Sequence, residues 1–266
     1  MGEAAPDLGP ASLLIAGALV LVHGGLSVWL RLGLTKRLAI AVTRMVVQLL
    51  LLGYVLVPVF QWGHPLPILA VCLAMLLMAT RAAIKRPSRR WRGMGPATFG
   101  SLALGAGVSA LIGTTLVIQP DPWWSPRFLI PVLGMILGNG LTGISLGLDR
   151  CLALFDEHRD RVESLLAYGA TPWEAARPVA AESIRTGLIP IMNTMTVVGV
   201  VSIPGMMTGQ LLGGTPPGLA ARYQIAIICL IAGATAVGVL GAVLATTRAL
   251  FDEAGRLRPE RLIQQG

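Results

Sequence analysis

Several polar side chains in this sequence stand inside long apolar stretches, where their chemistry needs an explanation. Arg44 and Gln48 are four residues apart and would share one face of a helix. Asn139 and Asn193 each interrupt an apolar run, and an amide without a hydrogen-bonding partner is costly in apolar surroundings. For both amides, hydrogen bonding to another helix and contact with a transported solute are alternative roles.

The surroundings of these residues have the composition of a membrane protein. Of the 266 residues, 54% are hydrophobic and only 13% are charged, whereas a soluble domain is about one quarter charged. The mean hydropathy is +0.72. The apolar residues form runs of roughly twenty, the length that a helix needs to cross about 30 Å of hydrocarbon. Composition therefore predicts an all-α, polytopic transmembrane helix bundle rather than a soluble protein.

Charged clusters and Pro/Gly stretches divide the chain into about seven expected spans. These are residues 11–30, 38–59, 66–84, 97–118, 128–149, 184–203 and 220–247. The leader carries Glu3 and Asp7 instead of basic residues, so the first span is expected to be a retained helix and not a signal peptide. We expect a single transmembrane domain over residues 1–266, with a cytosolic segment at about 151–183.

The basic residues indicate how the spans are oriented. Three follow the first span, six the third, five the fifth and four the seventh, so 18 of the 21 Lys and Arg residues fall on one side. Because cytosolic loops are enriched in Lys and Arg, the N-terminus is expected outside and the C-terminus in the cytosol. This distribution explains the net charge of +8, and no nucleic-acid partner is expected.

The sequence lacks an ATP-binding motif and has no acidic residue in the middle of an expected span. A P-loop needs glycine directly before its lysine, but Lys36 follows Thr35 and Lys85 follows Ile84, and the chain has no other lysine. We therefore expect no ATPase site, no catalytic residues and no cofactor in this chain. All 13 acidic residues fall in loops, in termini or, for Asp149, at the end of a span, which disfavours proton coupling through carboxylates in the membrane.

The segment Pro204–Gln210 is a candidate part of a translocation path. Its composition predicts a non-helical segment that either dips back into the membrane, with carbonyl oxygens, Thr208 and Gln210 lining the path, or forms an external loop. Met206 and Met207 could offer thioethers to a soft metal, although methionine usually fills cores and iron prefers oxygen or nitrogen ligands. Arg44 either extends to the membrane surface or contacts the same path. No metal-ligand set can be assigned.

Small residues recur every four or five positions in two of the expected spans. This spacing lets helix backbones approach closely in lipid, so these positions should form packing faces within one chain or between two copies. The residues are Ser101, Gly105, Ser109 and Gly113 in one span, and Gly134, Gly138, Gly143 and Gly147 in the next.

A helix, a sharp turn and a second helix are expected on the cytosolic side. Apolar residues from Cys151 to Leu166 recur at helical spacing among charged ones, which predicts an amphipathic helix. Gly169 should end it, because glycine tolerates the left-handed conformation. Thr171 is a suitable N-cap for the next helix, with Pro172 at its first position and Glu174 completing a capping box. A solvated connecting loop is the alternative.

This cytosolic segment resembles the coupling loop of ABC-importer permeases. That loop has an E-A-A-x-x-x-G core, and Glu163-Ser-Leu-Leu-Ala-Tyr-Gly169 has the same separation of Glu and Gly, followed by Ala170-Thr171-Pro172. The resemblance implies that the elbow from Glu163 through Tyr168 to Pro172 is the contact with an ATPase. A short helix held between two rigid transmembrane helices can transmit motion of a partner as a tilt.

Further motifs resemble the FetB family of ABC-transporter permeases and cover nearly the whole chain. The most specific is Pro204-Gly-Met-Met-Thr-Gly-Gln210. The others are Arg44-Met-Val-Val-Gln48-Leu, Pro131-Val-Leu-Gly-Met-Ile-Leu-Gly-Asn139, Ile189-Pro-Ile-Met-Asn193-Thr-Met195, Val198-Gly-Val-Val-Ser-Ile203 and Tyr223-Gln-Ile225. The resemblance implies a permease of the bacterial inner membrane that pairs with a separate ATPase, which binds ATP and Mg, and that exports iron. Plant relatives are linked to a nucleotide sugar.

The sequence thus predicts a homodimeric permease that works with a separate ATPase and exports iron, another metal or a chelate of it. An ABC permease for a nucleotide sugar, an ion-coupled carrier and a channel are the alternatives. A membrane scaffold without transport activity would explain the small-residue faces but not the cytosolic elbow.

Overall fold

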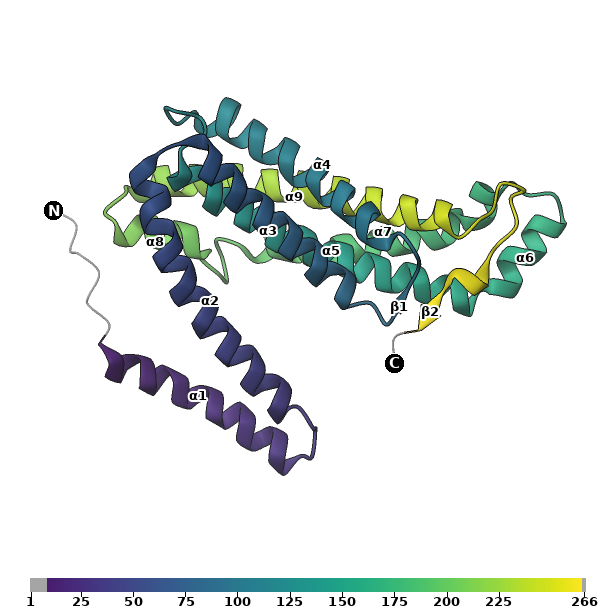
Figure 1. The fold of residues 1–266 in the computed structure, drawn as a ribbon, viewed down its shortest axis with the longest axis horizontal. Coiled ribbons are helices and arrows are strands. Elements are labelled where there is room, and N and C mark those ends of the chain that lie inside the picture. Colours follow the sequence, from purple (N-terminus) through teal and green to yellow (C-terminus); the bar gives the residue numbers. More distant parts are fainter. Residues whose placement is uncertain (1–8, 265–266) are drawn as a thin grey trace. The chain divides into compact units, whose positions relative to one another are not determined.

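The computed structural model describes residues 9–264. The acidic leader with Glu3 and Asp7, including the N-terminus itself, lies outside the described residues. The described chain is mostly helical, and its two strands, β1 (Arg89–Arg90) and β2 (Ile263–Gln264), pair in a short antiparallel ladder (Figure 1). The expected all-α polytopic bundle is confirmed.

The chain divides into two units, of which the first comprises residues 1–63 and 209–215. Its described part contains the hairpin of α1 (Pro10–Trp29) and α2 (Thr35–Trp62). The buried hydroxyl of Ser27 accepts a hydrogen bond from the Leu34 N–H at 3.1 Å, which ties the end of α1 to the start of α2. Most other side chains of this hairpin are exposed, as expected for helices that face lipid.

The second unit comprises residues 64–208 and 216–266. Its long helices are α3 (Pro65–Lys85), α4 (Met94–Ile112), α5 (Pro126–Glu157), α7 (Pro172–Val197) and α9 (Pro217–Ala249). Shorter elements are the π-helical turn η1 (Gly113–Ile118), α6 (Arg159–Ala167), the 3-10 turn η2 (Pro259–Arg261) and α8 (Gly205–Leu212), whose last four residues belong to the first unit.

The glycines of α5 show how α5 and α7 are packed. A Cβ atom on Gly143 would lie 2.7 Å from the carbonyl oxygen of Gly187, and one on Gly147 would lie 3.3 Å from that of Ser183. Residue numbers rise along α5 as they fall along α7, so the two helices are antiparallel. Only glycine permits so close an approach at Gly143, which confirms the packing face at Gly143 and Gly147 within one chain. The expected member Gly138 has no neighbour within 4 Å.

Similar approaches give the direction of the other helices. Gly143 and Gly147 of α5 approach Thr235 and Val243 of α9, so α5 and α9 are parallel. A Cβ atom on Gly105 of α4 would lie 2.5 Å from the Ala234 oxygen of α9. A Cβ atom on Gly241 of α9 would lie 2.9 Å from the Ser101 hydroxyl of α4, so α4 is antiparallel to α9. In α3, the Ala83 carbonyl accepts a hydrogen bond from Ser145 at 3.3 Å and Met75 approaches Gly134, so α3 is parallel to α5.

Six helices of the described chain have the length and apolar composition of a membrane span. They are α1, α2, α3, α4 with η1, α5 and α9. The expected span 184–203 is not among them, because the uncharged part of α7 after Arg185 is only roughly 18 Å long at about 1.5 Å per residue. Nevertheless α7 returns the chain from the end of α5 towards the start of α9, which is parallel to α5 (Figure 1).

The alternating directions gather most basic residues of the second unit at one end, here called the basic end. The C-termini of α3, α5 and α9 and the N-termini of α4 and α7 meet there (Figure 1). At the other end only Arg127 and Arg222 are basic. This separation is the pattern that the positive-inside rule relates to a cytosolic face. The orientation of the termini stays a prediction.

Candidate functional site

The predicted elbow is present at the basic end as a short helix between two long ones. α5 ends at Glu157, His158 connects it to α6, and α6 ends at Ala167 with Tyr168 as its C-cap. Gly169 adopts φ +92° and its N–H bonds to the Leu166 oxygen at 3.0 Å, while the Ala170 N–H bonds to the Leu165 oxygen at 3.0 Å. These two bonds form a Schellman motif, so the expected helix stop at Gly169 is confirmed.

The start of α7 is fixed by the expected capping box. The Thr171 hydroxyl accepts a hydrogen bond from the Glu174 N–H at 3.3 Å. In return, the Glu174 carboxylate accepts the Thr171 N–H at 2.8 Å and the Thr171 hydroxyl at 2.7 Å. These bonds, the backbone one first, lower the pKa of Glu174 from its ordinary value. Pro172 occupies the first helical position, as predicted.

The tip of the elbow presents aromatic side chains to the surroundings. Tyr168 is 91% exposed and Trp173, directly after Pro172, is 50% exposed. Glu163 is half-buried and accepts a hydrogen bond from Arg159 Nε at 2.8 Å within α6. An exposed tyrosine and tryptophan on a rigid turn are typical of a protein contact. Sequence reasoning missed Trp173, although its position next to the capped proline was a usable signal.

The helices on either side of the elbow differ from the expected boundaries. The predicted amphipathic helix from Cys151 is not separate from the fifth span, because α5 continues to Glu157. Its last turns are held by the α3–α4 loop. Asp149 accepts hydrogen bonds from the Ser88 N–H at 2.9 Å and the Ser88 hydroxyl at 3.0 Å, and Asp156 pairs with Arg89 at 2.6 Å. The second helix of the elbow is likewise continuous with the predicted sixth span.

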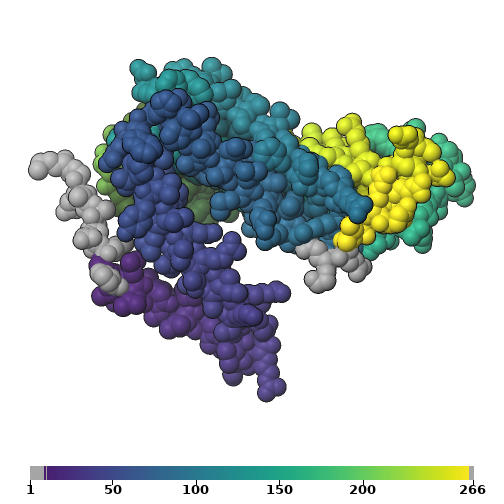
Figure 2. All heavy atoms as spheres, viewed as in Figure 1, coloured from purple at the N-terminus to yellow at the C-terminus, as the bar shows by residue number. Residues whose placement is uncertain are grey.

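The C-terminal segment after α9 lies against the elbow. Its turn at Gly255 has φ +74°, and a Cβ there would lie 3.0 Å from Pro172 Cγ. Phe251 packs edge-on against Phe155 of α5, with ring centroids 6.1 Å apart. Figure 2 shows the C-terminal residues (yellow) and α6 (green) as neighbouring surfaces. The elbow is therefore supported by residues from the far end of the chain, which the sequence did not reveal.

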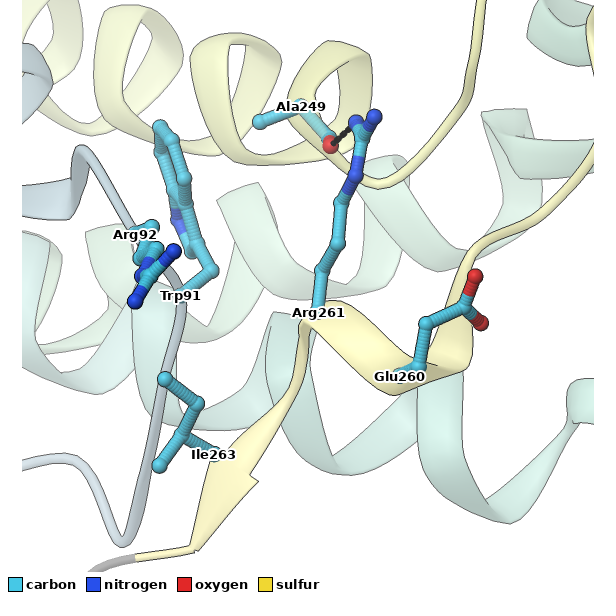
Figure 3. Close-up of a pocket in the computed structure, with 6 residues that line it drawn as sticks. All are labelled: Trp91, Arg92, Ala249, Glu260, Arg261 and Ile263. Carbon is cyan, nitrogen blue, oxygen red and sulfur yellow. Dashed lines mark hydrogen bonds between the residues drawn. The ribbon is translucent and has the colours of Figure 1, made fainter.

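The same segment closes over the end of α9 and borders an open pocket of about 620 Å³. Figure 3 shows Arg261 beside this pocket, with its guanidinium bonded to the Ala249 oxygen at 2.5 Å. It also donates to the Phe251 oxygen at 3.1 Å, so it caps carbonyls at the helix end. Trp91 forms the opposite wall, and its indole N–H donates to Thr246 of α9 at 3.2 Å.

The predicted path residues of the second unit lie on three elements. In α5, Asn139 is half-buried and donates to the Met135 oxygen of its own helix at 2.9 Å, so this bond does not link two helices. Asn193 is exposed on the last turns of α7. Met206 and Met207 are half-buried and Thr208 is exposed on α8.

The remaining path candidates belong to the first unit. Arg44 and Gln48 are exposed on α2 and line one shallow groove together, as their spacing predicted. The side-chain oxygen of Gln210 is buried and has no hydrogen-bond partner among residues 9–264. The structure thus brings Arg44 and Gln48 together, but the candidates as a set are divided between two units.

The expectation of non-helical backbone at Pro204–Gln210 is wrong. Residues 205–212 form the helix α8, and the Thr208 N–H bonds to the Pro204 oxygen at 3.0 Å. Proline is tolerated ahead of a helix, and each glycine within it costs only about 1 kcal/mol, so the composition did not exclude a helix. Carbonyls engaged in these bonds do not line a path. The irregular backbone lies earlier, where Gly199 has φ +83°.

Comparison with known proteins places the chain in a family. The model described as "Uncharacterised protein family (UPF0014)" matches residues 10–251. The chain belongs to this family. A UPF0014 membrane protein of Synechocystis is 39% identical over 85% of this chain and 85% of its own length. UPF0014 membrane protein STAR2 of Oryza sativa is 32% identical over 84% of this chain and 76% of its own length.

The expected resemblance to FetB is also confirmed. The protein named "Probable iron export permease protein FetB" of Escherichia coli is 29% identical over 92% of this chain and 93% of its own length. No solved structure matches the chain. The chain is therefore a multi-pass membrane protein of the UPF0014 family, whose relatives include a protein named as a permease.

Proposed function

We propose that this protein is the membrane-spanning subunit of an ABC transporter and that a separate ATPase binds its elbow. The observation that carries this proposal is the capped turn from Gly169 to Glu174, with Tyr168 91% exposed at its tip. Such a turn is rigid and presents aromatic surface at the basic end of the bundle. ATP and Mg would be bound by the partner, and hydrolysis would occur there.

The two helices that hold the elbow provide a mechanical connection into the membrane. α7 is continuous from Pro172 to Val197, so a tilt at its capped end displaces Asn193 near its other end. α5 would tilt with it, because Gly143 and Gly187 bring the two backbones into close contact. Tightly packed helices move as rigid bodies rather than bending, which suits a two-state transporter.

The proposed cargo is iron, another metal or a small chelate, moved outwards. The name of the Escherichia coli relative as a probable iron export permease supports this proposal. In this chain, the exposed amide of Asn193 and the hydroxyl of Thr208 lie on consecutive helices and could contact a hydrated or chelated ion through oxygen. Residues 9–264 contain no cluster of three or more His, Cys, Asp or Glu side chains placed to hold a metal.

Transport into inverted membrane vesicles tests this proposal. Vesicles that contain the chain and a co-purifying ABC ATPase from the same organism should accumulate radioactive iron when ATP is added. Vesicles with either protein alone should not. Asn193→Leu should lower the rate several-fold, whereas Asn139→Leu, whose amide bonds to its own helix, should have a smaller effect. Uptake of iron without ATP, or driven by an imposed ion gradient alone, would contradict the proposal.

A further inference from the structure

A second cleft at the basic end lies among the helices that form the elbow. It is bordered by α5, α6 and α7 and has a volume of about 200 Å³. Its floor is apolar and buried, and consists of Leu154, Val162, Ala175 and Val179. Its polar residues are Arg150, His158, Arg161 and Glu182.

Neither arginine of this cleft is paired within the described chain. Among the described residues 9–264, neither Arg150 nor Arg161 forms a hydrogen bond or ion pair. The carboxylate in the cleft, Glu182, is already paired with Arg185 at 2.8 Å. Two unpaired guanidinium groups, one from α5 and one from α6, therefore line a cleft whose buried side chains are apolar.

One lining residue of the cleft, Arg150, follows the end of the uncharged stretch of α5. Between Arg127 and Asp149, α5 carries no charged residue over roughly 30 Å, which equals the thickness of the hydrocarbon layer. Arg150 follows at once and is half-buried, so we expect its guanidinium at the depth of the lipid headgroups. His158 and Arg161 lie further out, at the side that faces water.

We infer that this cleft binds the phosphate headgroup of an anionic phospholipid. Arginine forms charge-assisted, bidentate bonds with phosphate oxygens, and basic pockets beside transmembrane helices are suited to anionic headgroups. The place of Arg150, just after the uncharged stretch of α5, favours a lipid headgroup over inorganic phosphate, because headgroup phosphates are concentrated at that depth. A headgroup bound by both arginines would link α5 to α6 and stiffen the elbow, independently of any ATPase.

Lipid binding to the purified full-length protein tests this inference. Delipidated protein is titrated with phosphatidylglycerol, phosphatidylcholine or inorganic phosphate, and bound ligand is counted by native mass spectrometry. Phosphatidylglycerol should bind in preference to phosphatidylcholine. The double variant Arg150→Gln/Arg161→Gln should weaken its binding roughly tenfold or more. Arg177→Gln removes an exposed arginine of α7 that does not line the cleft, and should change the affinity by less than about twofold.

Two further variants separate binding from folding. Arg161→Gln changes only an exposed residue and should weaken phosphatidylglycerol binding severalfold with an unchanged melting temperature. Arg150→Lys/Arg161→Lys keeps the charge and should retain most of the binding. Equal affinity of phosphatidylglycerol for the wild type and the double glutamine variant would overturn the inference. So would equal binding of phosphatidylcholine, or inorganic phosphate binding as tightly as the lipid, which would make the ligand a free anion.

Discussion

Gly255 of the C-terminal turn lies against Pro172, the first residue of α7, so closely that a Cβ on Gly255 would be 3.0 Å from Pro172 Cγ. These two residues connect the last segment of the chain to the elbow. Asp252 stabilises the turn by accepting the Arg256 N–H at 2.8 Å and by pairing with Arg258 at 2.7 Å. The backbone bond from Arg256 and the nearby Arg258 lower the pKa of the Asp252 carboxyl.

The substitution Gly255→Val should detach the C-terminal segment from the elbow. Valine is strained at φ +74° by about 1–2 kcal/mol, and its side chain would also collide with Pro172. We expect faster proteolysis after Leu250, measured on the purified protein by limited digestion and mass spectrometry. Gly63→Val is the control, because Gly63 also has positive φ, at +59°, but has no neighbour within 4 Å. Equal digestion of the two variants would show that the contact with Pro172 holds nothing in place.

Removal of the capping box should loosen the first turn of α7. Thr171→Ala removes the acceptor of the Glu174 N–H and should destabilise the turn by about 0.5–2 kcal/mol. Hydrogen exchange at residues 173–176 measures this as a loss of protection. Thr194→Ala is the control, since that hydroxyl bonds to the Pro190 oxygen within the same helix and makes no cap. Loss of protection in both variants alike would show that the cap has no special role.

The same cap should depend on pH. Because the folded pKa of Glu174 is lowered, its contribution is fully present above the ordinary glutamate pKa of about 4.3 and is lost as pH falls through the folded value. Protection of the first turn of α7, corrected for intrinsic exchange, should therefore be constant from pH 7 to about pH 5 and decline only at lower pH. Glu174→Gln should remove this decline. A decline centred near pH 6 would point to another group.

Close packing of α5 on α7 predicts that Gly143 cannot be enlarged. The Cβ atom of Gly143→Val would lie 2.7 Å from the Gly187 oxygen. That oxygen belongs to the backbone, so the clash could be relieved only by moving one of the two helices. Overpacking of this kind costs about 1–3 kcal/mol or more, so the melting temperature in detergent should fall by several degrees. Gly138→Val, on the same helix with no neighbour within 4 Å, should leave it nearly unchanged. Equal melting temperatures would contradict the helix packing.

Local rules of helix capping made much of the elbow predictable. Gly169, Thr171 and Pro172 act within a few residues of each other, so their roles follow from sequence alone. The hydrogen bonds from Ser88 to Asp149 near the end of α5 were not predictable, because Ser88 is distant in sequence. The contact between Gly255 and Pro172 depends on tertiary structure in the same way.

The polar residues in apolar helices could be identified from the sequence, but their contacts with other helices could not be predicted. Spacing correctly put Arg44 and Gln48 on one face of α2, since that is a property of a single helix. Spacing cannot determine which helices meet, so the partners of Asn139 and Asn193 were left open. The helix α8 was missed because glycine and proline were weighed as helix breakers without regard to their positions near a helix start.

The most direct test of the account is whether the elbow couples this protein to an ATPase. The measurement is ATP hydrolysis by the purified complex in proteoliposomes, with the ATPase alone as the baseline. Gly169→Val strains the residue at φ +92° and misdirects α7, whereas Gly33→Val imposes similar strain, at φ +67°, in the α1–α2 turn. We predict that Gly169→Val loses both co-purification of the ATPase and stimulation of hydrolysis, and that Gly33→Val retains them. Retention of both by Gly169→Val would contradict the account.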